Sequence, residues 1–194
     1  MKKKRILAMI LAVASCLSLA VGASAAGTTT RKATDFKDFD KSAWYAEAVS
    51  AAVDNGLLYG KSATIIDPNG DMTRAEMAAI INRSFGCYKT ADISQYKDVS
   101  KSKWYYKDVA LAVQMGTYNG RSSSAMAPDS PITRQEAMTV VARALGLDYD
   151  SYSKTDLSAF SDRSEISNWA LPYVRAMVGA DYIHGRGKIL APLD

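Results

Sequence analysis

Apolar residues between positions 36 and 86 follow helical spacing in two stretches, which a polar connection separates. In the first stretch the residues at intervals of one, three and four positions are Trp44, Ala48, Val49, Ala52 and Val53. This spacing predicts a helix with Ser42 as its N-cap and Gly56 as its left-handed C′ residue. A second helix is predicted from Thr73 to about Phe85, closed by Gly86. The Asp-Pro-Asn-Gly sequence at 67–70 predicts a turn between the two helices.

The same pattern occurs again when residues 36–86 are placed over residues 96–146 without gaps. The identical pairs include Asp38/Asp98, Trp44/Trp104, Gly56/Gly116, Gly60/Gly120, Thr73/Thr133, Arg74/Arg134 and Glu76/Glu136. By the same pattern Ser102 is the predicted N-cap in the second copy. Neither helix of a copy buries its apolar face alone, so the copies must pack against one another. The sequence therefore predicts a mainly all-α protein of helix-loop-helix repeats.

A third copy is expected over residues 160–194, beginning at Phe160 and Asp162 and continuing through Trp169 and Gly185. Asp181 stands where the other copies have the C′ glycine, and we expect it to adopt the left-handed conformation at some cost. The sequence reaches the position of Asp129 in this copy and contains no third Thr-Arg-x-Glu. The third repeat is therefore expected to be incomplete.

The first 25 residues have the order of features of a secretory signal peptide. Basic residues at positions 2–5 precede an apolar stretch, and a small-x-small cleavage site follows at Ala23-Ser24-Ala25. A retained membrane anchor and a lipoprotein signal at Cys16 are the two alternatives. Residues 26–35 are predicted to be a linker. The expectation is a secreted protein of the cell surface or cell wall, with no stable membrane span after cleavage.

The net charge of +4 comes entirely from the predicted signal segment. Without Lys2, Lys3, Lys4 and Arg5, acidic and basic residues are equal in number. A neutral mature chain gives no electrostatic reason to expect nucleic acid as a partner.

The Thr-x-x-Glu sequences at Thr73/Glu76 and Thr133/Glu136 predict capping boxes at the starts of the second helices. They account for Thr and Glu but leave Arg74 and Arg134 without a structural role. An arginine at the first helical position has the wrong sign for the helix dipole. The same position suits the binding of a carboxylate or phosphate, because the guanidinium fork and the helix N–H groups point to one place. A solvated arginine is the alternative.

At fixed offsets, these residues resemble the S-layer homology domain. The pattern of that family is Phe-x-Asp, Trp-Tyr or Trp-Ala, a glycine-rich segment, Pro-Asn and Thr-Arg-Ala-Glu. In the first copy these motifs are 36–38, Trp44-Tyr45, Gly56 with Gly60, 68–69 and 73–76. The resemblance covers nearly all of the chain after the signal segment, as repeats at 36–86, 96–146 and 160–194.

The resemblance implies three repeats in a pseudo-threefold bundle that anchors a protein non-covalently to the bacterial cell wall. The partner it implies is the secondary cell-wall polysaccharide of the peptidoglycan, held through the carboxylate of a pyruvate ketal. By position, the implied polysaccharide-binding residues are Arg74, Arg134, Asp38, Asp98 and Asp162. The alternative function is an envelope protein that assembles with other repeat-bearing chains. A partner or a second copy completing the third repeat is a further possibility that this pattern raises. Gln135 replaces the usual alanine of the motif, and we expect little effect from it at a helix surface.

Other chemistry has little support in this sequence. His184 is the only histidine, so neither a histidine metal site nor a Ser-His-Asp triad has the residues it needs. The acidic residues occupy repeat-equivalent positions, which favours repeated binding over one catalytic centre. We therefore expect no enzyme activity, cofactor or metal. Trp44, Trp104 and Trp169 have two interpretations, as core residues or as sugar platforms, and their helical spacing favours the core.

Overall fold

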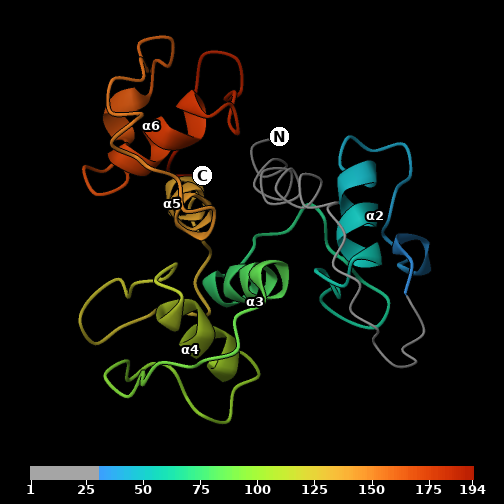
Figure 1. The fold of residues 1–194 in the computed structure, drawn as a ribbon. Coiled ribbons are helices and arrows are strands. Elements are labelled where there is room, and N and C mark those ends of the chain that lie inside the picture. The colour runs from blue at the N-terminus through green and yellow to red at the C-terminus, as the bar shows by residue number, and fades with distance from the viewer. Residues whose placement is uncertain (1–30) are drawn as a thin grey trace. The chain divides into compact units, whose positions relative to one another are not determined.

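The computed structural model describes residues 31–194, so the predicted signal peptide and the first half of the predicted linker, residues 26–30, lie outside the described residues. The described chain is mainly α-helical and contains no β-strand, which confirms the predicted fold class. Its five α-helices are α2 (Ala46–Asp54), α3 (Arg74–Phe85), α4 (Tyr106–Gln114), α5 (Arg134–Ala144) and α6 (Leu171–Gly179) (Figure 1). Two short 3-10 helices, η1 (Ala33–Asp35) and η2 (Arg163–Glu165), complete the set.

The chain divides into two compact units, with the boundary between Gly70 and Asp71. The described part of the first unit contains η1 and α2. Its core is formed by Phe36, Tyr45, Val49 and Ile66, all at most 4% exposed. The boundary lies inside the first predicted repeat, because α3 belongs to the second unit.

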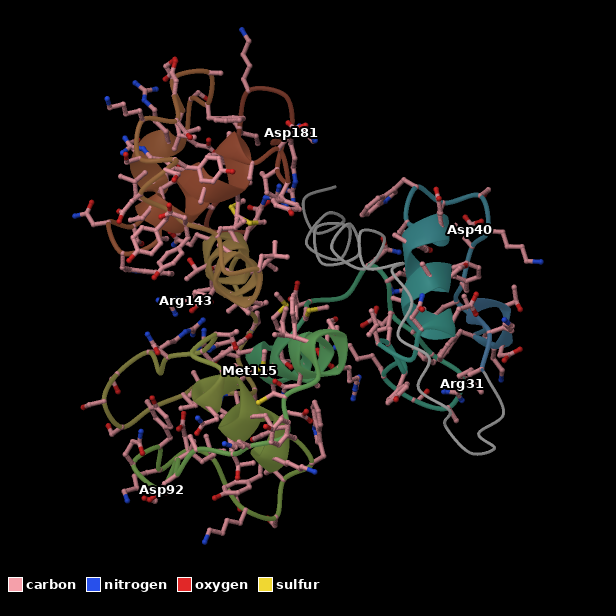
Figure 2. The ribbon with its side chains drawn as sticks, viewed as in Figure 1. Arg31, Asp40, Asp92, Met115, Arg143 and Asp181 are labelled. Atoms are coloured by element: carbon pink, nitrogen blue, oxygen red, sulfur yellow. The ribbon has the colours of Figure 1, made fainter. Side chains whose placement is uncertain are left out.

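In the second unit, each Thr-Arg-x-Glu helix packs against the first helix of the repeat that follows it. Helix α3 packs against α4, α5 packs against α6, and α3 also contacts α5 (Figure 1). Fully buried side chains on these helices include Met77, Ile81, Met138, Val141 and Met177. Arg143, in the last turn of α5, lies over the ring of Tyr173 on α6, with 4.7 Å between the guanidinium carbon and the ring centroid (Figure 2). The repeats are therefore interlocked rather than stacked as separate hairpins.

The predicted N-caps of the first helices are wrong. Helix α2 begins at Ala46 after Tyr45, and α4 begins at Tyr106, in both cases without a side-chain cap. Ser42 instead donates from its backbone N–H and its hydroxyl to Asp40, at 2.9 and 2.7 Å, in a turn before α2 (Figure 2). Ser102 likewise bonds to Ser100. These local side-chain bonds hold a turn in place of the first helical residues.

The predicted helix ends are confirmed. Gly56 and Gly86 have φ values of 67° and 70°, in the left-handed region. Asp181, which follows α6, has φ 65° and adopts the same conformation (Figure 2). A residue with a Cβ pays roughly 1–2 kcal/mol for this conformation, and aspartate tolerates it better than most.

Two kinds of feature are absent from residues 31–194. None of the helices in this range has the length and apolar character needed to cross a membrane. Nor does this range contain a group of three or more histidine, cysteine or acidic residues arranged to hold a metal ion.

Candidate functional site

The aspartate of each Phe-x-Asp motif clamps the loop that comes before the Pro-x segment of the same repeat. Asp38 accepts the backbone N–H groups of Ile66 and Asp67, at 2.9 and 2.7 Å. The same pair of bonds joins Asp98 to 126–127 and Asp162 to 190–191, at 2.9 and 2.6 Å in both repeats. The second residue of each pair has a positive φ of 51–54°, namely Asp67, Ala127 and Ala191. Charge-assisted hydrogen bonds therefore hold a strained loop in all three repeats.

The aromatic residue of the same motif packs against the glycine that follows the first helix. A Cβ atom on Gly60 would lie 2.4 Å from the ring of Phe36, and Gly60 has φ 82°. Tyr96 meets Gly120 at the same distance in the second repeat. Only glycine permits this approach. The segment after the first helix, which contains this glycine, is therefore packed against the aromatic ring.

Capping boxes open both Thr-Arg-x-Glu helices. The hydroxyl of Thr73 accepts the N–H of Glu76 at 3.2 Å, and the Glu76 carboxylate accepts the N–H of Thr73 at 2.8 Å. Thr133 and Glu136 form the same pair of bonds at 3.3 and 2.9 Å.

Arg74, which lies between Thr73 and Glu76, is buried and is bonded to the following repeat. Arg74 is 4% exposed, and its Nε donates to the carbonyl of Met126 at 2.9 Å. Its two terminal nitrogens donate to the Asn119 carbonyl at 3.0 Å and to the Glu136 carboxylate at 2.9 Å. Its guanidinium carbon lies 5.2 Å from the ring centroid of Tyr118, whose hydroxyl donates to the Arg74 carbonyl. The alternative of a solvated arginine is therefore wrong.

Arg134 occupies the equivalent place at the junction between the second and third repeats. It is also 4% exposed, and its Nε donates to the carbonyl of Leu190 at 2.8 Å. Leu190 is the first of the two residues that Asp162 clamps, just as Met126 is the first of the two that Asp98 clamps. We call these two sites the arginine junctions, at Arg74 and at Arg134.

The first N–H groups of the two helices are also taken up by the following repeat. The N–H groups of Arg74 and Ala75 donate to the carbonyls of Ser130 and Pro128, at 3.0 and 2.9 Å. Those of 134–135 donate to the carbonyls of 194 and 192, at 2.7 and 2.9 Å. The first N–H groups of a helix have no acceptor inside the helix. Here the carbonyl oxygens of the following repeat are their acceptors. The negative ends of these carbonyls also offset the unfavourable position of each arginine in the helix dipole.

Glu136 lies between two guanidinium groups and links them. Its side chain is 11% exposed, and it pairs with Arg74 at 2.9 Å and with Arg121 at 3.0 Å. Arg121 makes a bidentate contact, because its Nε and Nη2 bond to different carboxylate oxygens. Burial acts to raise the pKa of Glu136, but hydrogen bonds from Arg121 and Thr133 and the charges of both arginines hold it below its usual value. The three side chains together carry one net positive charge.

Arg121 is the residue of this cluster that the sequence interpretation missed. Its side chain is 40% exposed, so it presents the accessible face of the cluster. The sequence did contain a signal for this residue. A basic residue follows the glycine that packs on the aromatic ring in all three repeats, as Lys61, Arg121 and Arg186. Arg186 pairs instead with the carboxylate of Asp194.

Gln135 does not lie on a helix surface, as the sequence interpretation assumed. It is 4% exposed, and its side-chain oxygen accepts the backbone N–H of Ser167 in the third repeat at 2.9 Å. The usual alanine would leave this N–H without its partner.

We therefore expect Gln135→Ala to lower the free energy of unfolding by about 1–2 kcal/mol, the typical cost of leaving a partly buried donor unpaired. Urea unfolding followed by circular dichroism measures this change. Gln114→Ala, at the exposed last residue of α4, is the matched control and should change the free energy less. Equal unfolding midpoints for Gln135→Ala and the wild type would contradict this role for Gln135.

The tryptophan of each repeat is exposed, so its interpretation as a core residue is wrong. Trp44, Trp104 and Trp169 have exposed fractions of 47%, 60% and 52%. The neighbouring residue takes the core position, since Tyr45 and Tyr105 are 4% and 1% exposed and Ala170 is fully buried. The helix begins two residues after the tryptophan in each repeat, and this places the indole outside the packed face.

The fold and the junctions define a class of helical repeat protein, in which each repeat is fastened to the next by a buried arginine at a helix start. The chain belongs to the S-layer homology domain family, whose model matches residues 35–78 and 95–138. Each matched segment includes an Asp clamp and a Thr-Arg-x-Glu helix start.

Known relatives carry the same region within much longer chains. The chain is 33% identical to a surface-layer 125 kDa protein of Lysinibacillus sphaericus over 79% of its own length and 13% of the relative's. It is 26% identical to an endoglucanase of a Bacillus strain over 94% of its length and 19% of the relative's. A cell surface protein of Thermoanaerobacter kivui is 29% identical over 71% of this chain and 18% of the relative.

The chain therefore spans less than a fifth of the length of these relatives. The enzyme name of the second belongs to a protein of which more than four fifths lies outside the match. The family and the surface-protein relatives indicate a secreted protein of the cell surface.

Proposed function

We propose that this chain attaches non-covalently to the bacterial cell wall by binding a secondary cell-wall polysaccharide, and that an anionic group of the glycan is held at the arginine junctions. Membership in the S-layer homology family supports the attachment. The names of the surface-layer and cell-surface relatives support the location. A ketal carboxylate, as in a pyruvylated sugar, is the anion that we favour.

The observation that carries this proposal is the net positive charge of the Arg74–Glu136–Arg121 cluster. Two guanidinium groups share one carboxylate within 3.0 Å, so the cluster keeps an excess charge that attracts an anion. Arg121 is partly exposed, and its Nε and Nη2 are bonded to Glu136 and to the Pro131 carbonyl. Its Nη1 keeps two N–H groups, which can donate to an anionic oxygen of the glycan.

In this proposal Arg74 and Arg134 would contribute to binding as buried residues. The bonds of Arg74 to Met126, Asn119 and Glu136 use four of its five N–H groups, since Nη2 also donates to the Met126 sulfur. The positive charge and the one remaining donor, on Nη1, would add to the attraction of the ligand. Asp38, Asp98 and Asp162 would contribute by holding the loops that shape each binding surface, since both oxygens of each aspartate already accept backbone N–H groups.

The test is co-sedimentation of the mature protein with purified cell-wall sacculi. Arg121→Gln keeps the size and polarity of the side chain and removes its charge, so we expect binding to weaken about tenfold with the fold retained. Arg74→Ala combined with Arg134→Ala should abolish binding, and circular dichroism must accompany this pair because both residues are buried.

Lys107→Gln is the matched control, because it removes an exposed charge from α4 outside the junction. Sacculi from which the secondary polysaccharide has been removed chemically should bind none of the proteins. Unchanged binding of folded Arg121→Gln together with unchanged binding to stripped sacculi would reject polysaccharide anchoring. That result would favour an envelope protein that assembles with other repeat-bearing chains.

A further inference from the structure

Every tryptophan of the chain is exposed, and all three occupy the same position in their repeats. An indole is among the largest apolar groups, and leaving half of it in water forfeits part of the stabilisation that burial would give. A single exposed aromatic residue needs no explanation. Three at equivalent positions, each beside a residue that is buried, indicate a surface that is used.

The indole of Trp104 is held in place by a buried tyrosine. Its ring centroid lies 5.4 Å from that of Tyr105, and the planes meet at 78°. Trp44 and Tyr45 form the same edge contact at 5.7 Å and 82°. A perpendicular contact between the rings restrains the indole without covering it as a stacked ring would. This agrees with the 60% exposure of Trp104.

A carboxylate is hydrogen-bonded to this tyrosine. The Tyr105 hydroxyl donates to Oδ2 of Asp129 at 2.9 Å. Burial, together with this hydrogen bond and the charge of Asp129, raises the pKa of Tyr105 to about 12, so the donor keeps its proton at every physiological pH. Asp129 itself is exposed. An apolar ring and an acceptor of hydrogen bonds are thus positioned together through one buried side chain.

We propose that Trp104, Tyr105 and Asp129 form a sugar subsite, in which a pyranose ring stacks on the indole and a hydroxyl of the same glycan donates to Asp129. A pyranose has a face of C–H groups and a rim of hydroxyl groups. The C–H groups carry partial positive charge and pack on the negative face of the indole. The subsite rests on the proposed function, because it takes a further sugar unit of the wall polysaccharide, away from the anionic group held at the arginine junction.

The surroundings of Trp104 favour a sugar over a protein partner. The three residues before it, Lys101, Ser102 and Lys103, are all exposed and polar. Protein interfaces have an apolar centre from which charged residues are depleted, and lysine is among the depleted types. One ring in a polar setting instead matches the size and the mixed character of one sugar unit.

The third repeat lacks part of this subsite. Ala170 follows Trp169, so the tyrosine that adjoins the tryptophan in the other two repeats is missing. The three tryptophans should therefore differ in importance. Substitution of Trp104 should weaken glycan binding more than the same substitution of Trp169.

The test is calorimetric titration of the mature protein with secondary polysaccharide released from sacculi. Trp104→Leu keeps an apolar side chain without the aromatic face, and we expect the affinity to fall about tenfold. Trp104→Phe keeps an aromatic face and should lose less than threefold. Tyr88→Leu, at an 83% exposed aromatic residue outside the subsite, is the control and should bind as the wild type does.

The outcomes separate this inference from the function on which it rests. If the wild type fails to bind the polysaccharide, the proposed function is rejected. If the wild type binds and Trp104→Leu binds equally well, the sugar subsite is rejected while the anchoring function stands. A loss for Trp104→Leu confined to binding of another protein, such as a second copy measured by ultracentrifugation, would also overturn the sugar subsite. Because the indole is exposed, these variants are expected to fold, and circular dichroism checks it.

Discussion

Glu136→Gln is expected to lower the free energy of unfolding by about 3–5 kcal/mol, the cost of removing one partner from a buried ion pair. Arg74 is 4% exposed, and without the carboxylate its guanidinium would keep a positive charge inside the protein with only carbonyl dipoles as partners. The same change weakens the capping box of α5, because a neutral amide accepts the Thr133 N–H less strongly. Urea unfolding at neutral pH measures the difference.

Glu47→Gln is the matched control for this variant. Glu47 lies in the first turn of α2 and is exposed, so neutralising it should leave the unfolding midpoint nearly unchanged. If Glu136→Gln and Glu47→Gln have the same small effect, the buried cluster contributes no net stability.

The same carboxylate predicts how stability depends on pH. The pKa of Glu136 is lower in the folded protein than the value of about 4.3 expected when unfolded. A group of this kind contributes stability that is complete above its unfolded pKa and is lost as the pH falls through its folded pKa. The difference between wild type and Glu136→Gln should therefore be full at pH 7 and shrink below about pH 4. A difference that stays constant down to pH 2 would contradict this linkage.

Asp98→Ala is expected to cost about 2–4 kcal/mol, since it removes two hydrogen bonds to a charged acceptor and leaves two N–H groups without that partner. The loop that loses its clamp includes Ala127, whose φ of 54° is unfavourable for a residue with a Cβ. It also includes Met126, whose carbonyl accepts Nε of Arg74. Loss of the clamp should therefore loosen the arginine junction as well as the loop.

Hydrogen exchange separates these two effects. In Asp98→Ala, the N–H groups of residues 126–127 and of the α3 start at 74–75 should both exchange faster than in the wild type. Asp92→Ala is the control, because Asp92 is exposed and bonds only within its own turn, to Ser94. Faster exchange confined to residues 126–127 would mean that the clamp and the junction are independent.

Local sequence chemistry was sufficient to predict most of the helical pattern. The second helix of the first repeat was expected from Thr73 to Phe85, and α3 spans Arg74–Phe85. The helix ends at Gly56, Gly86 and Asp181 depend on φ preferences of single residues, which are encoded locally. The starts of the first helices were misplaced because Ser42 forms a turn with Asp40, and both outcomes satisfy the same serine hydroxyl.

The candidate site could be predicted only in part. The motif singled out Arg74 and Arg134 as residues that the capping box does not explain, but it did not show that both are buried against the following repeat. It did not reveal that Arg74 bonds to Glu136, because these residues lie 62 positions apart. For the same reason it missed Arg121 and placed Gln135 on a surface, since the partners of both residues belong to segments distant in the chain.

The sequence by itself determined the helical repeats, their left-handed ends and their family, because helix spacing, glycine and capping residues act through neighbours within a few positions. The tertiary structure alone decided that each Thr-Arg-x-Glu helix packs on the following repeat, that its arginine is buried against that repeat, and that the tryptophans face the solvent. The physical reason is that burial and ion pairing depend on which surfaces meet. The repeats share the same pattern of motifs, so that pattern alone does not specify which copy a given helix will contact.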